Sequence, residues 1–374
     1  MALASDYEKP VLGEAVEAEL LDFVSCRMEE ISENAFQSLR TCTDFIRSIR
    51  MHLLTRWPNR MCHTLFRRRE FFMNDTIRIL QLSDTHFLED GADPEGAAAY
   101  NTDEAFDAVF RHIGEHDDLD LVVVTGDVAD HGRRPQYRKA AEAFSRFSVA
   151  VNVIPGNHDQ EAVFTASMAR PSVSTSRVIE VGAWAFLFVD SSAGNLVIDA
   201  AGRAVDPPDY ADRLHSDGNL GTAEAAWIRD MVSQVGTDHV FIWVHHPPGC
   251  PVGMLNAEAY NAEWADLLGD LPTVRGLGAG HTHAPDTYEF MGRTVHVGPA
   301  LKNNFDLTKN TWLPPGYRSY TFGADGAVQS QLQLVDDDRW PRRPFGRAMR
   351  ALFDGELTFD DLRAIAERKA LEGA

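Results

Sequence analysis

The segment 151–160 reads "VNVIPGNHDQ", and in it an apolar run stops at a Pro-Gly pair and three polar side chains follow at once. These three are Asn157, His158 and Asp159. Proline, glycine, asparagine and aspartate all favour turns, so a surface turn is one interpretation of the segment taken by itself. The other is a buried strand that delivers functional side chains at its carboxyl end, and the rest of the chain decides between the two.

Four further strand-like runs end in similar polar clusters. The run "TIRILQLSD" (76–84) leads into "SDTH", and "LDLVVVTGD" (119–127) leads into "GDVAD". Two later runs end in "VHHPP" (244–248) and "GHTH" (280–283). Because the carboxyl ends of parallel strands line one crevice of an α/β sheet, we expect all five clusters to converge. The polar residues gathered in this way are Asp84, His86, Asp127, Asp130, Asn157, His158, Asp159, His245, His246, His281 and His283.

Each cluster also has a simpler interpretation. "GDVAD" is typical of a strand-to-helix turn, "VHHPP" of a surface turn and "GHTH" of a polar hairpin loop. Independent turns in this order, each at the end of a predicted strand, are less probable than one shared site. Single members stay open to a structural role, His246 and Asp159 above all.

The donor types of the set indicate a metal centre. Carboxylates, imidazoles and a carboxamide oxygen, without a thiolate, suit Mn, Fe, Zn or Co and not a cysteine-type structural zinc site. A set of this size exceeds the needs of one ion and fits two ions that share a carboxylate. Two ions about 3.5–4 Å apart can stabilise the attacking and the leaving oxygen of an in-line phosphoryl displacement. Glycines precede three of the clusters (Gly126, Gly156 and Gly280) and let backbone and ligands approach closely.

Helical patterns separate these strands. Apolar spacing predicts helices over 102–116 and 135–147, and a third over 222–235 with Thr222 as its N-cap. Hairpins are predicted where Gly182 interrupts an apolar run and around the "FMGR" and "ADG" turns further along. The alternation predicts an α/β domain.

The motif order D-x-H, G-D-x-x-D, G-N-H-D, H-x-P and G-H-x-H resembles the calcineurin-like metallophosphoesterases, and all five motifs are complete. The resemblance spans residues 76 to about 335. Details such as "LQLSDTHFLED" and "VHHPPGC" resemble the class III 3′,5′-cyclic-nucleotide phosphodiesterases of that superfamily. The implied fold is a four-layer α/β/β/α sandwich of two mixed sheets.

The same resemblance implies a metal-binding role for seven residues. One ion would be held by Asp84, His86 and His283. The other would be held by Asn157, His245 and His281. Asp127 would bridge the two ions.

The same motif correspondence implies a role in the reaction for four residues. His158 would be the catalytic histidine, and Asp130 would hydrogen-bond it and set its tautomer. Asn157 would neutralise phosphate charge besides binding a metal ion. His246 would face the substrate pocket or support a ligand.

The implied reaction is hydrolysis of a small phosphodiester, with 3′,5′-cyclic AMP as the specific candidate. A hydroxide bridging the two ions would attack phosphorus, and His158 would help the alkoxide to leave. A broader phosphodiesterase acting on glycerophosphodiesters is the alternative with the same site. A lipid-A-pathway pyrophosphatase is disfavoured, because those relatives carry arginine where His158 stands. A non-catalytic scaffold of the same fold is disfavoured too, because scaffolds lose ligands and every ligand is present here.

One segment departs from the cyclic-nucleotide subgroup, and a second forms a long loop. Residues 298–316 lie where close relatives commonly have a short Pro-Ser turn and a Cys-x-Phe stretch. Residues 195–217 form a long loop over the expected pocket. We expect both segments to shape the choice of substrate.

The overall charge and composition exclude other classes of protein. The net charge is −21, from 56 acids and 35 bases, so the surface repels nucleic-acid backbones and no nucleic-acid partner is expected. The four cysteines form no CxxC pair, which fits a reducing cytoplasm. No apolar run approaches the roughly 18 residues of a membrane span, and the first 20 residues lack the basic region of a secretory signal. We expect a cytoplasmic protein, with a homodimer as a candidate assembly.

Composition divides the chain into three predicted regions. The catalytic domain is predicted over 73–340, followed by a helical tail over 341–374. The first 72 residues, with 11 acids and 10 bases, carry an acidic and then a basic stretch. They are a helical extension used for assembly, a basic amphipathic surface for a membrane or partner, or an upstream stretch attached by a wrongly assigned start codon. We favour the last, with Met73 as the natural initiator.

Overall fold

The computed structural model describes one part of the chain in detail. The described residues are 76–89, 91, 101–114, 118–168, 170–195, 197–198, 204–205, 218–252, 257–342, 344, 350–351 and 353–356. The chain divides into two units, Met1–Phe72 and Met73–Ala374, and all described residues belong to the second. The predicted extension 1–72, most of the predicted tail 341–374 and most of the loop 195–217 lie outside the described residues.

The first sheet has the strand order β16–β15–β1–β2–β3–β4. Its strands are Thr76–Leu82 (β1), Leu121–Thr125 (β2), Val151–Ile154 (β3), Val173–Ser174 (β4), Gly316–Gly323 (β15) and Val328–Leu334 (β16). β1, β2, β3 and β4 run parallel, whereas β15 is antiparallel to both β1 and β16. The carboxyl ends of β1, β2 and β3 therefore meet at one edge of the sheet.

The second sheet has the order β11–β12–β10–β9–β6–β5. Its strands are Val178–Val181 (β5), Trp184–Phe188 (β6), His239–Trp243 (β9), Val274–Ala279 (β10), Asp286–Phe290 (β11) and Arg293–Val297 (β12). β6, β9, β10 and β12 run parallel, and the predicted hairpins β5–β6 and β11–β12 add the antiparallel edges. Both sheets are therefore mixed.

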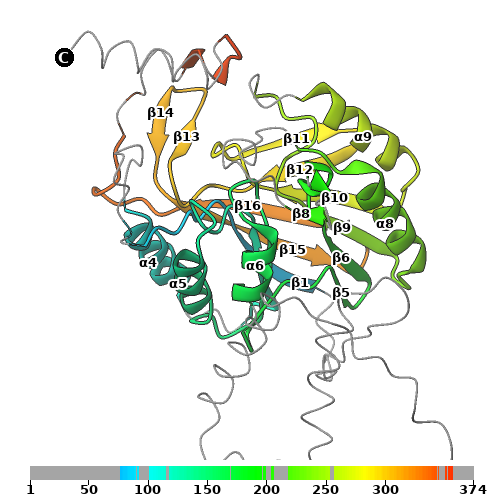
Figure 1. Ribbon diagram of the computed structural model, residues 1–374, viewed down its shortest axis with the longest axis horizontal. Coiled ribbons are helices and arrows are strands. Elements are labelled where there is room, and N and C mark those ends of the chain that lie inside the picture. The colour runs from blue at the N-terminus through cyan, green and yellow to red at the C-terminus, as the bar shows by residue number, and fades with distance from the viewer. Residues whose placement is uncertain are drawn as a thin grey trace, which may run out of the picture. The chain divides into compact units, whose positions relative to one another are not determined.

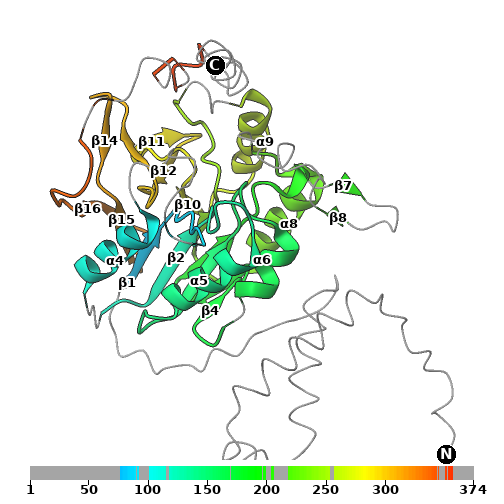
Figure 2. The same ribbon diagram turned by 60° about the vertical axis from the view of Figure 1, so that its left-hand side comes forward.

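Helices cover the outer face of each sheet. α4 (Thr102–Ile113), α5 (Arg134–Phe144) and α6 (Glu161–Met168) lie on one side, and α8 (Gly221–Gln234) and α9 (Glu258–Gly269) lie on the other (Figure 1). Figure 2 shows the two sheets between these helical layers. The predicted four-layer α/β/β/α sandwich is confirmed.

Alternating side chains build the layers of the core. Ile79 of β1 and Phe186 of β6 point between the two sheets, in one buried cluster. Their neighbours Leu80 and Leu187 point the opposite way, into clusters beneath the helices. This period of two is what a strand buried on both faces requires.

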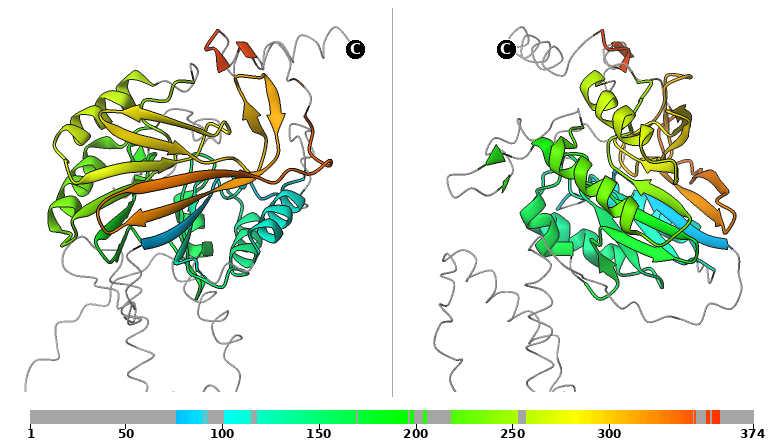
Figure 3. Two further views of the ribbon diagram at one scale, coloured as in Figure 1. Left: turned by 180° about the vertical axis from the view of Figure 1, so that it is seen from behind. Right: turned by 90° about the vertical axis from the view of Figure 1, so that its right-hand side faces the viewer.

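Smaller elements complete the described fold. β13 (Asn304–Asp306) and β14 (Thr311–Leu313) form a ribbon inside the predicted variable segment 298–316. β7 (Val197–Ile198), β8 (Ala204–Val205) and a 3₁₀ turn, Ala193–Asn195, precede α8. Viewed from behind, the β15–β16 hairpin lies next to the β11–β12 hairpin (Figure 3), and the Arg318 guanidinium donates to the carbonyl oxygens of Asp286 and Val297 across this junction. In the part of the chain that the structure describes, no helix has the length and apolar character to cross a membrane.

The start of α8 differs from its prediction. The helix begins at Gly221, and Leu220 occupies the N-cap position without a side-chain cap, so the predicted Thr222 cap is wrong. The Leu220 N–H instead donates to Glu263 Oε2 of α9, at 3.0 Å. A contact between helices therefore replaces the local cap that the sequence indicated.

Candidate metal centre

The five predicted clusters meet at the carboxyl edge of the parallel strands. The loops after β1, β2 and β3 supply the clusters of the first sheet, and those after β9 and β10 supply the clusters of the second. Most of the predicted site residues are buried, whereas His158, His281 and His283 are half-buried. Segments up to 200 positions apart in the sequence thus form one site, as predicted.

Four donor atoms converge as one group, those of Asp84, His86, Asp127 and His283. Nε2 of His86 lies 3.2 Å from Nε2 of His283 and 3.4 Å from Oδ2 of Asp127. Nε2 of His283 lies 3.5 Å from Oδ1 of Asp84. Metal–ligand bonds of about 2.1 Å place neighbouring ligands roughly 3.0–3.4 Å apart, so this spacing fits an ion at the centre of the group.

The tautomers that fit the hydrogen bonds of the two histidines also favour a cation there. Nδ1 of His86 is hydrogen-bonded to Oδ1 of Asp130 at 2.8 Å, and Nδ1 of His283 to the carbonyl oxygen of Asn303 at 3.2 Å. Both partners are acceptors, so the hydrogen of each neutral ring sits on Nδ1. The two Nε2 lone pairs then face each other and the carboxylates, and a positive ion between them removes the repulsion.

The pKa values of these rings agree with a neutral ligand state. Burial, with the charges of His158 and Lys302, lowers the pKa of His86 to about 4, although the hydrogen bond with Asp130 opposes the shift. Burial and the neighbouring His86 hold the pKa of His283 well below its usual range. Neutral imidazole is the form that binds metal ions.

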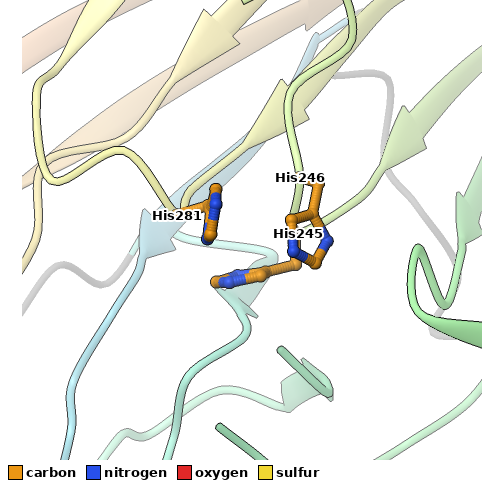
Figure 4. A group of neighbouring side chains, drawn as sticks. All are labelled: His245, His246 and His281. Atoms are coloured by element: carbon orange, nitrogen blue, oxygen red, sulfur yellow. The ribbon is translucent and has the colours of Figure 1, made fainter. Parts of the chain in front are cut away.

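A second group of donors lies on the other side of Asp127. Nε2 of His245 is 3.1 Å from Oδ1 of Asn157 and 3.4 Å from Oδ2 of Asp127, while its Nδ1 is hydrogen-bonded to the carbonyl of Thr125 at 2.8 Å. The ring of His281 lies 5.0 Å from that of His245 (Figure 4). Asp127 Oδ2 thus lies at the same distance from a histidine of each group, where a bridging ligand belongs.

Buried negative charge shifts the pKa values of two residues in this centre upward. Burial and the Asp127 charge raise the pKa of Asp84 to about 7, although His245 opposes the shift. Burial alone would lower the pKa of His245, but the carboxylates of Asp127 and Asp84 raise it to about 9. The excess of buried negative charge that draws protons to these groups is what two cations would neutralise.

The three glycines lie where the prediction places them. A side chain at Gly126, Gly156 or Gly280 would run into His245, Asp127 or Asp84 respectively. At Gly156 an added Cβ would overlap the amide nitrogen and Oδ1 of Asp127. Glycine is therefore required for the close approach of loop and ligand.

The predicted partnership of Asp130 and His158 is formed by a different atom. Nδ1 of His158 donates to the backbone carbonyl of Asp130 at 2.8 Å, where a carboxylate contact was expected. The Asp130 carboxylate instead accepts from Nδ1 of His86, a predicted metal ligand. The backbone N–H of His158 donates to Oδ1 of Asp127 at 2.9 Å, which holds His158 beside the carboxylate predicted to bridge the ions.

Asp159 has a structural role. Its carboxylate accepts from the backbone N–H groups of Val128, Ala129 and Gly156 at 3.0, 3.1 and 2.9 Å. These bonds join the loop after β2 to the loop after β3. Burial and Asp127 raise the pKa of Asp159 to about 6 in spite of the three donors.

His246 is buried behind the second group of ligands. Its Nδ1 is 2.7 Å from Ser191 Oγ, and its carbonyl accepts from the Tyr260 hydroxyl at 2.8 Å. Its ring lies 4.3 Å from that of His281 (Figure 4). With 2% of its surface exposed, His246 fits the predicted alternative of a ligand support better than contact with substrate.

Two residues that contact the site were not predicted from the sequence. Gln81 donates to the carbonyl of Ala279 at 2.7 Å and accepts from the Tyr320 hydroxyl at 2.6 Å, so it ties the two sheets together beneath the site. Its signal was a polar residue inside the apolar run "TIRILQL". Lys302 lies 2.6 Å from Asp130 Oδ1, and its only signal was a basic residue in the variable segment.

Comparison with known proteins identifies the family. The family model described as calcineurin-like phosphoesterase matches residues 77–285, more than half of the chain and all five motifs. The chain belongs to this family. The family implies a dinuclear metal centre. The donor atoms on either side of Asp127 fit one, because its Oδ2 lies 3.4 Å from Nε2 of His86 and 3.4 Å from Nε2 of His245.

Individual relatives are named as phosphodiesterases. The 3′,5′-cyclic adenosine monophosphate phosphodiesterase CpdA of Escherichia coli is 25% identical over 274 residues, which cover 71% of this chain and 92% of the relative. A probable glycerophosphodiester phosphodiesterase, GpdQ of Arcobacter nitrofigilis, is 28% identical over 218 residues, covering 56% and 72%. A 3′,5′-cyclic-nucleotide phosphodiesterase of Nostoc is 23% identical over 278 residues, covering 69% and 92%.

Proposed function

We propose that this protein is a dinuclear-metal phosphodiesterase that hydrolyses a small phosphodiester, with 3′,5′-cyclic AMP as the specific candidate. The reaction class, metal-dependent hydrolysis of a phosphoric diester, is supported by the family and by relatives named as phosphodiesterases. The observation that carries the proposal is the pair of Nε2 atoms of His86 and His283, 3.2 Å apart and aimed at each other among carboxylates. For cyclic AMP the support is the relative CpdA, of which 92% is aligned.

We assign the ligands as the motifs imply. Asp84, His86 and His283 would hold one ion, and Asn157, His245 and His281 the other, with Asp127 shared. When bound, such ions polarise the phosphoryl oxygens and lower the pKa of water. The nitrogen and oxygen donors suit Mn, Fe, Zn or Co, and we propose iron and manganese first.

His158 is assigned to the leaving oxygen. Its Nδ1 is committed to the Asp130 carbonyl, so only the doubly protonated ring can donate a proton from Nε2. Its backbone bond to Asp127 keeps that ring beside the carboxylate shared by the ions. Protonation of the departing alkoxide is general-acid catalysis, which typically contributes 10²- to 10⁴-fold.

A glycerophosphodiester is the second candidate substrate. The relative GpdQ carries this name, and its identity of 28% is slightly higher over a shorter alignment. The same ligands and the same His158 would serve it. The two candidates differ in the groups around the phosphate, not in the reaction.

A comparison of three substrates tests the proposal. Steady-state hydrolysis by the manganese-reconstituted full-length chain is measured with 3′,5′-cyclic AMP, glycerophosphocholine and bis(p-nitrophenyl) phosphate. Asn157→Ala is the control for chemistry at this site. The highest kcat/KM on cyclic AMP, lost in the variant, supports the first candidate. Turnover of the generic diester alone refutes both substrates but keeps the metal centre.

Location and assembly are proposed from the sequence alone. We place the reaction in the cytoplasm, because four cysteines without a CxxC pair fit a reducing compartment. We also retain a homodimer as a proposal, which light scattering on the purified chain would test.

A further inference from the structure

The segment Ala300–Phe305, which leads from β12 into β13, contacts the first group of predicted metal ligands. The backbone N–H of Lys302 donates to the carbonyl of Asp84 at 3.1 Å, and that of Phe305 donates to the carbonyl of His283 at 2.6 Å. The carbonyl of Asn303 accepts from Nδ1 of His283. One short segment therefore contacts two ligands of the same ion through its backbone.

The Lys302 side chain reaches the third ligand of that ion through Asp130. Its Nζ is 2.6 Å from Oδ1 of Asp130, and the same oxygen accepts from Nδ1 of His86 at 2.8 Å. The side chains of Lys302 and Asp130 are only 12% and 6% exposed, so water screens the pair little. The backbone carbonyl of Asp130 holds His158.

Asp130 therefore positions two residues of the site and also carries a buried charge. Its carboxylate orients a metal ligand, its carbonyl orients the catalytic histidine, and its negative charge needs a partner in a buried place. We propose that Lys302 is a positioning residue of the metal centre. It neutralises Asp130 and directs its carboxylate toward His86, so that both His86 and His158 keep their orientation.

A lysine suits this position for electrostatic reasons. A buried carboxylate this close to the ligand atoms could turn into the centre and compete for an ion; its donor atoms group with those of His86 and His158. An ammonium group 2.6 Å away gives that carboxylate an alternative charge partner. Partners behind metal-bound histidines typically affect metal affinity by 10- to 100-fold when they are removed.

The test measures manganese binding to the full-length chain without substrate, by calorimetry on metal-free protein. Lys302→Met should weaken the binding of one of the two manganese ions by about 10- to 100-fold. Lys302→Arg, which keeps the charge, should restore most of the affinity. Lys309→Met is the matched control, because Lys309 lies nearby in the turn between β13 and β14, is 77% exposed and pairs with Asp306. This variant should bind manganese like the parent chain.

A double-mutant cycle shows whether Lys302 acts through Asp130. In an Asp130→Asn background, Lys302→Met should cause little further loss of manganese affinity. An undiminished further loss would overturn the proposal, and so would unchanged manganese affinity in Lys302→Met itself. Should Lys302→Met fail to fold, Lys302→Gln against Lys302→Arg makes the same comparison. Since no substrate is used, failure of the proposed substrate leaves this test intact.

Discussion

Replacing Gly156 with alanine would place a methyl group against the carboxylate that we assign to both metal ions. A Cβ built at Gly156 overlaps the amide nitrogen and Oδ1 of Asp127 and lies 2.9 Å from its Cγ. Carbon–carbon contacts are comfortable from about 3.5 Å, so the Asp127 carboxyl carbon must move by about 0.6 Å or more. Metal–ligand distances hold to within about 0.2 Å. A displacement this large should therefore cost metal occupancy and about 10- to 100-fold in kcat/KM.

The control for this change is Gly236→Ala, because a Cβ at Gly236 meets nothing within 4 Å. Neither glycine has its backbone in the left-handed region, so the two variants differ in contact and not in strain. Manganese per chain is measured by elemental analysis, and kcat/KM with bis(p-nitrophenyl) phosphate. If Gly156→Ala keeps two manganese ions and activity within twofold of the control, the contact does not set the position of Asp127.

Two further predictions concern residues of the assigned site, and a third concerns the buried His296 of β12. Asp127→Ala should lose both ions, whereas Asp84→Ala should lose one; two retained ions in Asp127→Ala, counted by elemental analysis, would refute the bridge. His158→Ala should keep its ions and lose about 10²- to 10⁴-fold in kcat, and normal turnover would remove its catalytic role. Burial and Arg318 lower the pKa of His296 from 6.5 to about 4, so its neutral form is favoured in the fold. The contribution of His296 to the free energy of unfolding, fully present above pH 6.5, should fall by about 3 kcal/mol by pH 4. In chelator-treated protein, the free energy of unfolding of His296→Gln, measured with urea, should lack this loss. An equal dependence of that free energy on pH in both proteins would contradict the prediction.

The order of the elements and the place of the site were predictable because they depend on short-range patterns. Apolar runs that end in Asp84, Asn157 and His281 show both the strand and the direction in which it runs. Parallel pairing then brings the ends together without any knowledge of side-chain contacts. The glycines at the same places carried the further information that space around the ligands is tight.

Individual side-chain contacts between residues far apart in the sequence were not predictable. Lys302 and Asp130 are 172 positions apart, and nothing in either neighbourhood indicates the other. The choice between backbone and side chain in the Asp130–His158 contact depends on a loop conformation that the motif does not specify. The start of α8 was misplaced for the same reason, since Glu263 of another helix accepts from its Leu220 N–H.

Backbone strain is concentrated at the residues that we assign as metal ligands. Among the ligand residues, Asp84, His86, Asp127, His281 and His283 have positive φ angles, between 42° and 71°. Each costs about 1–2 kcal/mol in an L-residue, and together they approach the 5–15 kcal/mol that stabilise a whole domain. Such strain persists only where the surroundings over-determine the backbone. The loops meet this condition through bonds to their neighbours, such as the His86 N–H to the Asp127 carbonyl at 2.8 Å. The sheets and loops therefore hold the assigned ligand residues in this strained conformation.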